Sequence, residues 1–526
     1  MNSKDETSYD QLPYADNCFP YTHPDYLATI AALHGMNEPA LESCRVLELG
    51  CAMGGNLMPM ALELPDSRFV GIDLSPRQVG EGKALANRLG IRNLDLLAMS
   101  IADIGPDFGM YDYIVCHGVF SWVPAPIRDH ILRICSQNLA PGGIAYISYN
   151  TYPGWHARGL IRDMLAYHVR LADGGPRERV ARARAFLQEI VAALPLPESA
   201  FGTIVRIEAE FLEDVSETYL YHEHLEESNN PLYFHQFMDL ARAHGLQFLD
   251  EAKVANLFDG LPHHSQATVE HWSPDPLARE QYIDFLTNRT FRRSLLSHAG
   301  CRRFRPLSAD SIERMFIGTD VMPISDEPDV ASDAAEEFGR PAGLANLTTN
   351  NPLLKAALVS LAGVRPNSLK FGDLWERVRC RLGERLGILL GEEDGPSMLR
   401  EALLRCFQSN LVELSLRPPR FAESPGGYPR GYPLAVAQAE RDARITNLRR
   451  RTVVVEDFDR LTLAQLDGKR GLEDIARAMA SAIFRGDFTL SDADGPIRDI
   501  NRLEAIAADE LPASLERLAR MALIEA

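Results

Sequence analysis

The sequence predicts an α/β protein whose N-terminal part is a doubly wound parallel sheet. From Cys44 onward, short apolar runs alternate with stretches of helix length, as strands and crossover helices do in a parallel sheet. A glycine-containing segment follows the first apolar run, and an aspartate ends the second. Both features are typical of sheets that bind a ligand at the carboxyl ends of their strands.

Five strands are predicted: Arg45–Leu49, Arg68–Asp73, Leu94–Met99, Tyr111–Cys116 and Ile144–Tyr149. A helix over Ala125–Leu139 precedes the fifth strand, since Pro141, Gly142 and Gly143 end the helix and start the strand. Right-handed crossovers make such a sheet doubly wound. After Trp155 the sequence becomes helical, and no further β/α alternation is expected.

The chain of 526 residues is long enough for roughly three domains. We expect the α/β domain over residues 1–170, a helical middle domain over 171–317 and an α+β domain over 350–526. The stretch 318–349 is acidic and rich in Pro and Ala, which indicates a linker or an exposed loop. Short β-prone pieces such as Arg451–Val455 interrupt the C-terminal helices.

Composition limits the kinds of partner. The net charge of −19 repels polyanions, so neither nucleic acid nor an anionic membrane is an expected partner, and Arg441–Arg451 is interpreted as a solvated helix face. No apolar run reaches the length of about 18 residues that a membrane span needs, and Met1–Asp10 lacks the features of a secretion signal. The eight cysteines are scattered singly. We therefore expect a cytoplasmic protein with reduced thiols and no metal site.

The strongest motif is Val46–Asn56, V-L-E-L-G-C-A-M-G-G-N. Its glycines let the backbone approach a ligand closely, although a strand-to-helix turn can also need glycine for packing alone. Ala52 stands where the middle glycine of G-x-G-x-x-G would be, so a pyrophosphate is less well supported. Asp73 ends the second strand and can accept hydrogen bonds from both hydroxyls of a ribose. Together the two signals predict an adenosine ligand, and the glycine spacing favours S-adenosylmethionine over a nicotinamide cofactor.

Four pieces of the chain resemble the class I S-adenosylmethionine-dependent methyltransferases, namely E-L-G-C-A-M-G-G-N, G-I-D-L-S, Y-D-Y-I-V-C-H-G and N-L-A-P-G-G. Y-D-Q-L-P-Y, H-G-V-F-S-W-V-P and S-Y-N-T-Y-P-G-W are similar to the group with an appended regulatory domain, which includes bacterial protein lysine methyltransferases acting on rickettsial outer-membrane proteins. L-T-N-R-T-F-R-R-S-L-L (Leu286–Leu296) and L-A-Q-L-D-G (Leu463–Gly468) fit the same group. The resemblance implies a Rossmann-like sheet, with a winged helix as one form of the C-terminal domain.

The resemblance also implies a set of cofactor-binding residues. Those beside the methionine part are Glu48, Gly50, Cys51, Ala52, Gly54 and Asn56, and those beside the adenosine are Asp73, Leu74, Met99, Ser100 and Ile101. His117, Gly118 and Val119 follow the fourth strand, next to the transferred methyl group. His117 has an equally good alternative as a structural hydrogen-bonding residue.

The N-terminal segment is dense in aromatic residues: Tyr9, Tyr14, Phe19, Tyr21 and Tyr26. Aromatic faces attract a cation and exclude water, so this segment is predicted to be a lid over the sulfonium, with Tyr9 and Tyr14 as its main members. The alternative is a segment that packs its rings onto the sheet.

The residues after the fifth strand, Tyr149, Asn150, Tyr152, Pro153 and Trp155, are predicted either to form the acceptor pocket or to cap the sheet. Methyl transfer is an in-line displacement that requires alignment rather than a fixed acid, base or metal. If the acceptor is an amine, His117 or Tyr14 could receive its proton. The predicted catalytic residues are His117, Tyr14, Tyr149, Asn150 and Trp155.

The leading hypothesis is S-adenosylmethionine-dependent methyl transfer to a protein side-chain amine by an enzyme expected to be a homodimer. One alternative is a small-molecule N- or O-methyltransferase. Another is a catalytically silent regulatory or interaction protein with a retained methyltransferase fold, whose C-terminal helices could form a winged helix. Such a module binds DNA in other settings, but the net charge disfavours DNA binding here. A nicotinamide-dependent dehydrogenase is disfavoured, because Ala52 replaces the central glycine and no Ser, Tyr and Lys set follows at the usual spacing.

Overall fold

The computed structural model describes residues 8–13, 17–170, 174–253, 261–301, 306–340, 347–383, 394–418, 421–422, 424–492 and 495–526. The chain forms two compact units. Unit 1 comprises residues 1–16, 39–57 and 64–304, and unit 2 comprises residues 17–38, 58–63 and 305–526. The domain boundaries proposed from the sequence stay a prediction.

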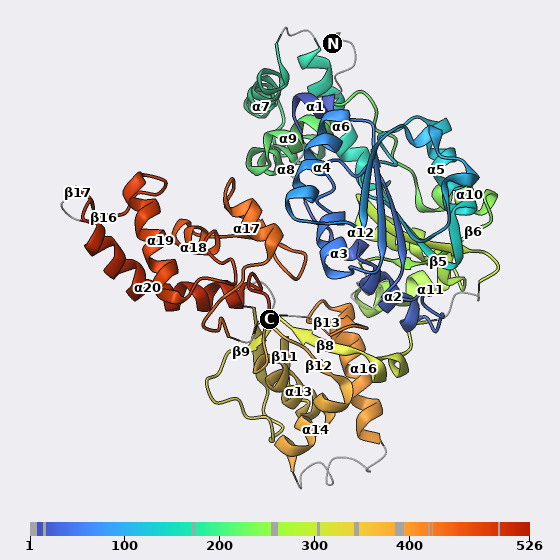
Figure 1. Ribbon diagram of the computed structural model, residues 1–526. Coiled ribbons are helices and arrows are strands. Elements are labelled where there is room, and N and C mark those ends of the chain that lie inside the picture. The colour runs from blue at the N-terminus through green and yellow to red at the C-terminus, as the bar shows by residue number, and fades with distance from the viewer. Residues whose placement is uncertain are drawn as a thin grey trace. The chain divides into compact units, whose positions relative to one another are not determined.

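Unit 1 is built on a seven-stranded sheet with the strand order β3-β2-β1-β4-β5-β7-β6 (Figure 1). Its strands are β1 (Arg45–Leu49), β2 (Arg68–Asp73), β3 (Leu94–Ala98), β4 (Tyr111–Cys116), β5 (Leu139–Asn150), β6 (Leu246–Glu251) and β7 (Phe291–His298). The first five strands are parallel, and β7 is antiparallel to both of its neighbours. The predicted doubly wound sheet is confirmed, with β1, β2 and β4 at the predicted bounds.

The prediction that no β/α alternation continues after Trp155 is wrong, because β6 and β7 follow helices of the middle region and extend the sheet. Both strands carry charged residues that are buried in ion pairs, and these residues interrupt the apolar pattern expected of a buried strand. Arg292 of β7 is fully buried, and its guanidinium donates to Asp284 and to Glu251 of β6, each at 2.8 Å. Because charged residues are seldom fully buried, their presence makes the two segments resemble solvent-exposed sequence.

The helix before β5 is shorter than predicted. α5 (Ala125–Gln137) ends before Leu139, and Leu139 already pairs with Tyr111 in the sheet. The pairing of β4 and β5 shifts register between Tyr111 and Tyr113, opposite the Pro-Gly-Gly sequence. The glycines thus lie within an irregular strand rather than in a turn before it.

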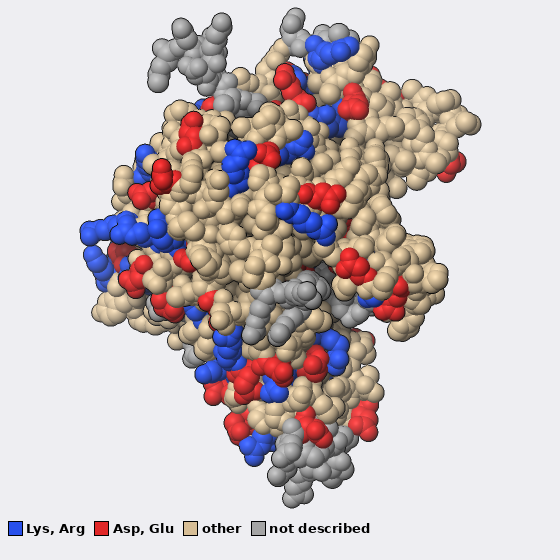
Figure 2. Space-filling model, turned by 90° about the vertical axis from the view of Figure 1, so that its right-hand side faces the viewer, with Lys and Arg blue, Asp and Glu red and all other residues tan. Residues whose placement is uncertain are grey.

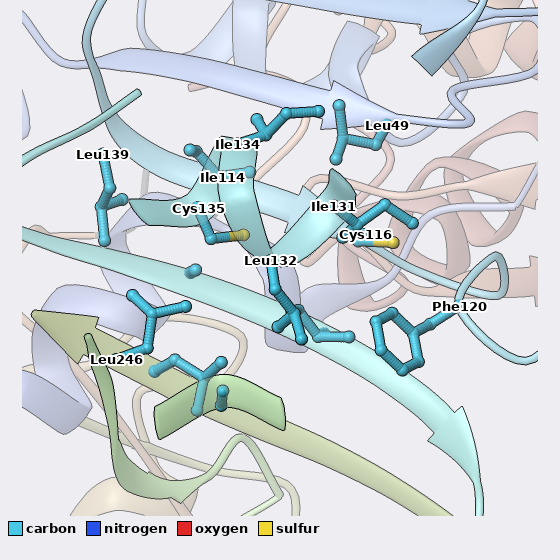
Figure 3. Close-up of a cluster of buried hydrophobic side chains, with 14 of the residues drawn as sticks. Leu49, Ile114, Cys116, Phe120, Ile131, Leu132, Ile134, Cys135, Leu139 and Leu246 are labelled. Carbon is cyan, nitrogen blue, oxygen red and sulfur yellow. The ribbon is translucent and has the colours of Figure 1, made fainter. Parts of the chain in front are cut away.

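Helices cover both faces of the sheet, and Figure 1 shows α4 (Pro76–Arg88) and α5 on opposite sides. The core between the sheet and α5 contains Leu49, Ile114 and Phe120 together with apolar residues of α5 (Figure 3). The remaining helices of the α/β and middle regions are α1 (Ser8–Gln11), α3 (Leu57–Glu63), α6 (Gly154–Val169), α7 (Pro176–Ala193), α8 (Ala200–Asp214), α9 (Glu217–Leu220), α10 (Phe234–Ala243), α11 (His263–Trp272) and α12 (Pro276–Thr287), with a π-helix over Tyr221–Leu225.

Unit 2 combines helices with small antiparallel sheets. Its helices are α2 (Pro24–Leu33), α3 except its first residue, α13 (Pro352–Ala362), α14 (Phe371–Leu382), α16 (Asp394–Gln408), α17 (Pro433–Ala439), α18 (Asp457–Leu463), α19 (Leu472–Arg485) and α20 (Ile500–Arg520). β12 (Leu369–Lys370), β8 (Phe316–Thr319) and β13 (Val412–Ser415) form one sheet. The hairpin β16 (Ser491–Asp492) and β17 (Gly495–Pro496) between α19 and α20 has the place of the wing in a winged helix.

The segment 318–349, predicted as a linker or exposed loop, contains three short strands. β9 (Met322–Pro323), β10 (Glu336–Gly339) and β11 (Leu347–Thr349) pair in an antiparallel sheet. This segment is therefore partly ordered by backbone pairing that its composition does not reveal.

The arginine-rich run Arg441–Arg451 is not the predicted helix face. It contains β14 (Arg444–Thr446), which pairs with β15 (Thr452–Val454), and its last three arginines form ion pairs with carboxylates of unit 2. Arg450 contacts Glu63 at 2.7 Å, and Arg449 and Arg451 contact Asp320. On the face that Figure 2 shows, basic and acidic side chains of the coloured residues are mixed. These arginines are thus already neutralised by protein carboxylates.

Among the helices of the described residues, none has both the length and the apolar character that crossing a membrane would require.

Candidate cofactor and acceptor site

The turn after β1 brings the backbone close to neighbouring strands. The N–H groups of Gly50 and Cys51 both donate to the carbonyl of Ile72, at 2.9 Å each. Gly50 has a φ of +79°, and a Cβ at this position would lie 2.4 Å from Cγ2 of Val119. Glycine is therefore required here by both the conformation and the space, and the turn forms a cradle of exposed backbone. Gly54 closes this turn with a φ of +83°.

Asp73 at the end of β2 is fixed by backbone groups on both sides. Its Oδ2 accepts a hydrogen bond from the N–H of Ala52 and its Oδ1 accepts one from the N–H of Ser75, each at 2.9 Å. Each carboxylate oxygen keeps a further lone pair, so Asp73 can accept from two adjacent hydroxyl groups. Leu74 beside it is 64% exposed and can pack against an adenosine.

Ala52, the departure from the glycine-rich pattern, has the backbone conformation that a glycine would supply. Its φ is +50°, in the left-handed region that residues with a Cβ seldom adopt. The hydrogen bond from its N–H to Asp73 accompanies this conformation. The departure in sequence is therefore not a departure in the shape of the turn.

Glu48, Cys51 and Asn56 are buried around the turn. Nδ2 of Asn56 donates to Oε1 of Glu48 at 2.8 Å, which connects the end of β1 to the residues before α3. Cys51 packs against Gly71 of β2, where a Cβ would lie 2.7 Å from its Sγ. The structure thus brings these three predicted residues together as the support of the turn.

The ends of β3 and β4 lie at the same edge of the sheet. The N–H of Met99 donates to the carbonyl of Asp73 at 2.9 Å, and Ser100 caps the short 3₁₀ helix that begins at Ile101. The N–H of Gly118 donates to Oγ of Ser148 at 2.8 Å. The predicted adenine and methionine residues therefore converge on one edge, beside Asp73 and the glycine turn.

His117 is held by a hydrogen bond inside the protein. Its Nδ1 lies 2.9 Å from the hydroxyl of Tyr146, which is fully buried. Burial, and to a smaller extent the nearby positive charge of Arg293, lowers the pKa of His117 to about 3. The imidazole is therefore neutral at physiological pH and a weak base, which favours the structural alternative for this residue.

The N-terminal segment is attached beside the cofactor residues at two points. The hydroxyl of Ser75 donates to the carboxylate of Asp10, and Nη1 of Arg77 donates to the carbonyl of Asp10 at 3.2 Å. His222 of the π-helix lies with its Nε2 2.6 Å from the carbonyl of Leu12. Asp10 thus lies next to the N-terminus of α4, beside the cofactor residues, and the role of the N-terminal segment as a lid over the sulfonium stays a prediction.

Two predicted lid residues fall outside what is described. Tyr14 and the side chain of Tyr9 lie outside the described residues, so their part in the lid stays a prediction. Tyr21 and Tyr26 pack against one another in unit 2, with their ring centroids 5.4 Å apart.

Asn150 ends β5 and is 3% exposed. Its N–H donates to Oγ of Ser121 at 2.8 Å, and its Nδ2 donates to Oδ1 of Asn229 at 3.0 Å. The same stretch of the middle region continues along β5, where the N–H of Leu232 donates to the carbonyl of Asn150. Asn150 is therefore bordered by the loop after β4 and by residues from far along the chain.

Tyr149 and Trp155, also predicted at the acceptor end, are buried. The ring of Tyr149 stacks on Phe237 with the centroids 4.2 Å apart, and its hydroxyl lies 3.4 Å from Oγ of Ser294. Burial raises the pKa of Tyr149, so it holds its proton. These placements favour packing roles for Tyr149 and Trp155 over contact with an acceptor, and their catalytic roles stay a prediction.

A band of aromatic side chains starts just beyond Asn150. Tyr152 stacks on His156 with the centroids 4.1 Å apart, and the hydroxyl of Tyr233 lies 2.9 Å from Nε2 of His156. Further ring contacts continue the band outward, from Tyr233 to Phe285, Tyr282 and Trp272. Phe285 and Trp272 are 46% and 47% exposed. An exposed aromatic surface of this kind is typical of protein contact sites.

Sequence reasoning missed four residues that border the site: Ser75, Ser121, His222 and Asn229. Ser75 carries a readable signal, since a serine before proline is typical of a helix N-cap, and its Oγ caps α4. The other three carry none, because their relevance depends on contacts across the fold.

Within the described residues, no three histidine, cysteine, aspartate or glutamate side chains come together as a metal-binding group. The eight cysteines are free thiols.

Three family profiles match parts of the chain. Residues 47–145 match a family described as a methyltransferase domain, residues 216–298 a predicted methyltransferase regulatory domain, and residues 427–523 a C-terminal winged helix domain of PKMT. Strands β2, β3 and β4 lie within the first range, β6 and β7 within the second, and the wing within the third.

Relatives cover almost the whole chain. The uncharacterized protein RP789 of Rickettsia prowazekii is 34% identical over 498 residues, which span 93% of this chain and 88% of that protein. RP028 of the same organism is 38% identical over 46% of this chain and 96% of its own length. The structure of PKMT2 from Rickettsia typhi in complex with AdoHcy superimposes with a TM-score of 0.85 at 30% identity, over 97% of this chain and all of that one.

Proposed function

We propose that this chain methylates lysine side chains of a protein, with S-adenosylmethionine as the methyl donor. The premise is that the chain belongs to the methyltransferase family that includes PKMT2 from Rickettsia typhi. PKMT abbreviates protein lysine methyltransferase, and AdoHcy is the product that remains when S-adenosylmethionine has given up its methyl group. The observation that supports S-adenosylmethionine as the cofactor is the carboxylate of Asp73, which two backbone N–H groups fix beside the glycine turn after β1.

The residues of this edge fit S-adenosylmethionine in shape and chemistry. Asp73 would accept from the ribose hydroxyls, Leu74, Met99 and Ile101 would border the adenine, and the turn from Gly50 to Gly54 would lie along the methionine part. When bound, the sulfonium supplies a methyl group to a nucleophile. The protein's own part is to align that nucleophile and to exclude water with the N-terminal segment.

A lysine must be neutral before its nitrogen can act as a nucleophile. Burial lowers the pKa of an ammonium group, because removal from water disfavours the charged form. His117, with a pKa of about 3, is too weak a base to take this proton at neutral pH. In this proposal the proton leaves to water as the side chain enters the site, and Asn150 orients the neutral amine.

The aromatic band favours a protein over a small molecule. It starts two residues after Asn150 and extends through Tyr233 and Phe285 to Trp272, and its outer rings are exposed, as rings that contact a long protein chain would be. Aromatic faces also attract the positive charge of lysine and arginine, and the net charge of −19 favours approach of a basic segment.

The test is transfer of tritiated methyl groups from S-adenosylmethionine to reduced and alkylated lysozyme, with free lysine as the small acceptor and Asp73→Ala as the inactive control. We expect label in the protein, at lysine by mass spectrometry, and none with Asp73→Ala. Label in free lysine alone would favour the small-molecule alternative. No transfer to either, with S-adenosylmethionine still bound, would favour a catalytically silent protein.

The proposal includes a cytoplasmic location and a homodimer. Light scattering after size-exclusion chromatography tests the dimer, and a mass of 58.5 kDa would contradict it.

A further inference from the structure

Asn150 has most of its polar groups already in use. Its N–H is bonded to Ser121, its carbonyl to the N–H of Leu232 at 3.1 Å, and its Nδ2 to Oδ1 of Asn229. Because the side chain is nearly buried and anchored at its nitrogen, its amide plane has little freedom to turn. The position of Nδ2 therefore determines where Oδ1 points.

The side-chain oxygen of Asn150 differs from the side-chain nitrogen in its hydrogen bonding. Among the described residues, none donates a hydrogen bond to Oδ1 of Asn150. An amide oxygen has two lone pairs, and Oδ1 of Asn150 is not one of the side-chain atoms that are both fully buried and unpaired, so an incoming donor can reach it. Since Nδ2 is bonded to Asn229, Oδ1 lies on the other branch of the planar amide, directed away from that bond, and is available to the N–H of a ligand.

Asn229 is itself fixed by the backbone that follows it. The N–H of Asn230 donates to the carbonyl of Ser121 at 2.8 Å, and the carbonyl of Leu232 accepts from Oγ1 of Thr151 at 2.7 Å. The segment 229–232 therefore lies along the end of β5 and the loop after β4. A side chain on this segment is placed firmly enough to orient its neighbour.

We propose that Asn229 is a positioning residue of the methyl-acceptor site, which holds Nδ2 of Asn150 so that Oδ1 accepts a hydrogen bond from an N–H of the neutral lysine amine. This inference rests on the proposed function. An amine that donates one N–H to Oδ1 keeps its lone pair free. The hydrogen bond also fixes the orientation of the amine, and so the direction in which the lone pair points. The amide of Asn150 thus selects and aligns an N–H donor, and the middle region of the chain supplies the residue that aligns the amide.

The experiment compares Asn229→Ala with Asn229→Asp, whose carboxylate can still accept from Nδ2 of Asn150. We expect Asn229→Ala to lower kcat about tenfold on lysozyme, as for loss of one aligning hydrogen bond, with KM and AdoHcy affinity unchanged. Asn229→Asp should restore kcat to within about threefold. Ser228→Ala, an exposed neighbour, is the matched control and should leave kcat unchanged.

A double-mutant cycle with Asn150→Leu separates positioning from general weakening. If Asn229 acts through Asn150, the double variant is no slower than Asn150→Leu alone. Three results would overturn the inference. The first is a double variant whose loss of kcat is the product of the two single losses, the second is an equal loss of kcat in Asn229→Ala and Asn229→Asp, and the third is full activity in Asn229→Ala.

A readout without turnover distinguishes this inference from the proposed function. In protein labelled with ¹⁵N-asparagine, the side-chain amide signal of Asn150, identified by its loss in Asn150→Leu, should lose the downfield position of a hydrogen-bonded N–H in Asn229→Ala and keep a downfield position in Asn229→Asp. An unshifted signal contradicts the positioning role whether or not the enzyme methylates lysozyme. Absence of methyl transfer by the unchanged enzyme contradicts only the proposed function.

Discussion

The cofactor half and the acceptor half of the candidate site are built by different means. At the cofactor half, backbone N–H groups of Ala52 and Ser75, which are 21 and 2 residues away in sequence, fix Asp73, and glycine conformations shape the turn after β1. At the acceptor half, side chains make the important contacts, and Asn150 meets Asn229, which is 79 residues away. The difference teaches that cofactor binding depends on local backbone geometry, whereas acceptor alignment depends on how the middle region packs onto the sheet.

Replacing Asn150 should give the largest effect and should separate the two halves. We expect Asn150→Leu to lower kcat about 100-fold, the loss typical of removing one preorganised hydrogen-bonding group, with unchanged AdoHcy affinity. Calorimetric titration and steady-state kinetics measure the two quantities. A parallel loss of AdoHcy binding would show that the halves are not independent.

Gly50→Ala should damage the cofactor half through the backbone. Its Cβ would lie 2.4 Å from Val119 at a φ of +79°, so we expect a loss of about 1–3 kcal/mol in the free energy of unfolding and about tenfold in AdoHcy affinity. Urea denaturation and titration measure these losses.

Gly118→Ala is the matched control for that change, because its φ is +66° but no atom lies within 4 Å of the new Cβ. It isolates the cost of the conformation from the cost of the clash. Equal losses in the two variants would mean that the contact with Val119 is unimportant.

His222→Ala tests whether the middle region also assists the cofactor half. Loss of its contact with the carbonyl of Leu12 should free the N-terminal segment and weaken AdoHcy binding about fivefold, the equivalent of about 1 kcal/mol. His264→Ala, an exposed histidine of α11, should bind AdoHcy as the unchanged protein does. Unaltered affinity in His222→Ala would refute a lid role for this segment.

The smallest effect is expected at the far end of the aromatic band. Trp272→Ala should lower kcat/KM about threefold for lysozyme and leave transfer to a short lysine peptide unchanged, since only a long chain reaches Trp272. Tyr167→Ala removes an exposed aromatic ring of α6 that makes none of the ring contacts of this band, and should have no effect. An equal loss of kcat/KM with the short peptide would show that Trp272 does not act by contacting a long protein chain.

The sequence predicts the cofactor half well, because its signals are local. Apolar runs and their spacing predict β1 and β2, and Asp73 follows from its place at the end of β2. The left-handed conformation of Ala52 is not readable, because alanine seldom adopts it and the surrounding turn imposes it.

Asn150 is predicted at the acceptor end from its place after β5, whereas its partner Asn229 and the far edge of the sheet escape prediction for a physical reason. β7 carries Arg292, whose charge is neutralised only by partners brought close in the folded chain. Asn229 lies in a polar stretch that reads as an ordinary turn until β5 is placed beside it. Contacts between segments far apart in sequence therefore decide both features, and no local pattern encodes them.

The most direct test of the account is calorimetric titration of the full chain with S-adenosylmethionine and, separately, with NAD, using Asp73→Ala as the control. The account predicts saturable binding of S-adenosylmethionine, weakened about 100-fold by Asp73→Ala through loss of two charge-assisted hydrogen bonds, and no binding of NAD. Unchanged affinity in Asp73→Ala, or preference for NAD, would contradict it.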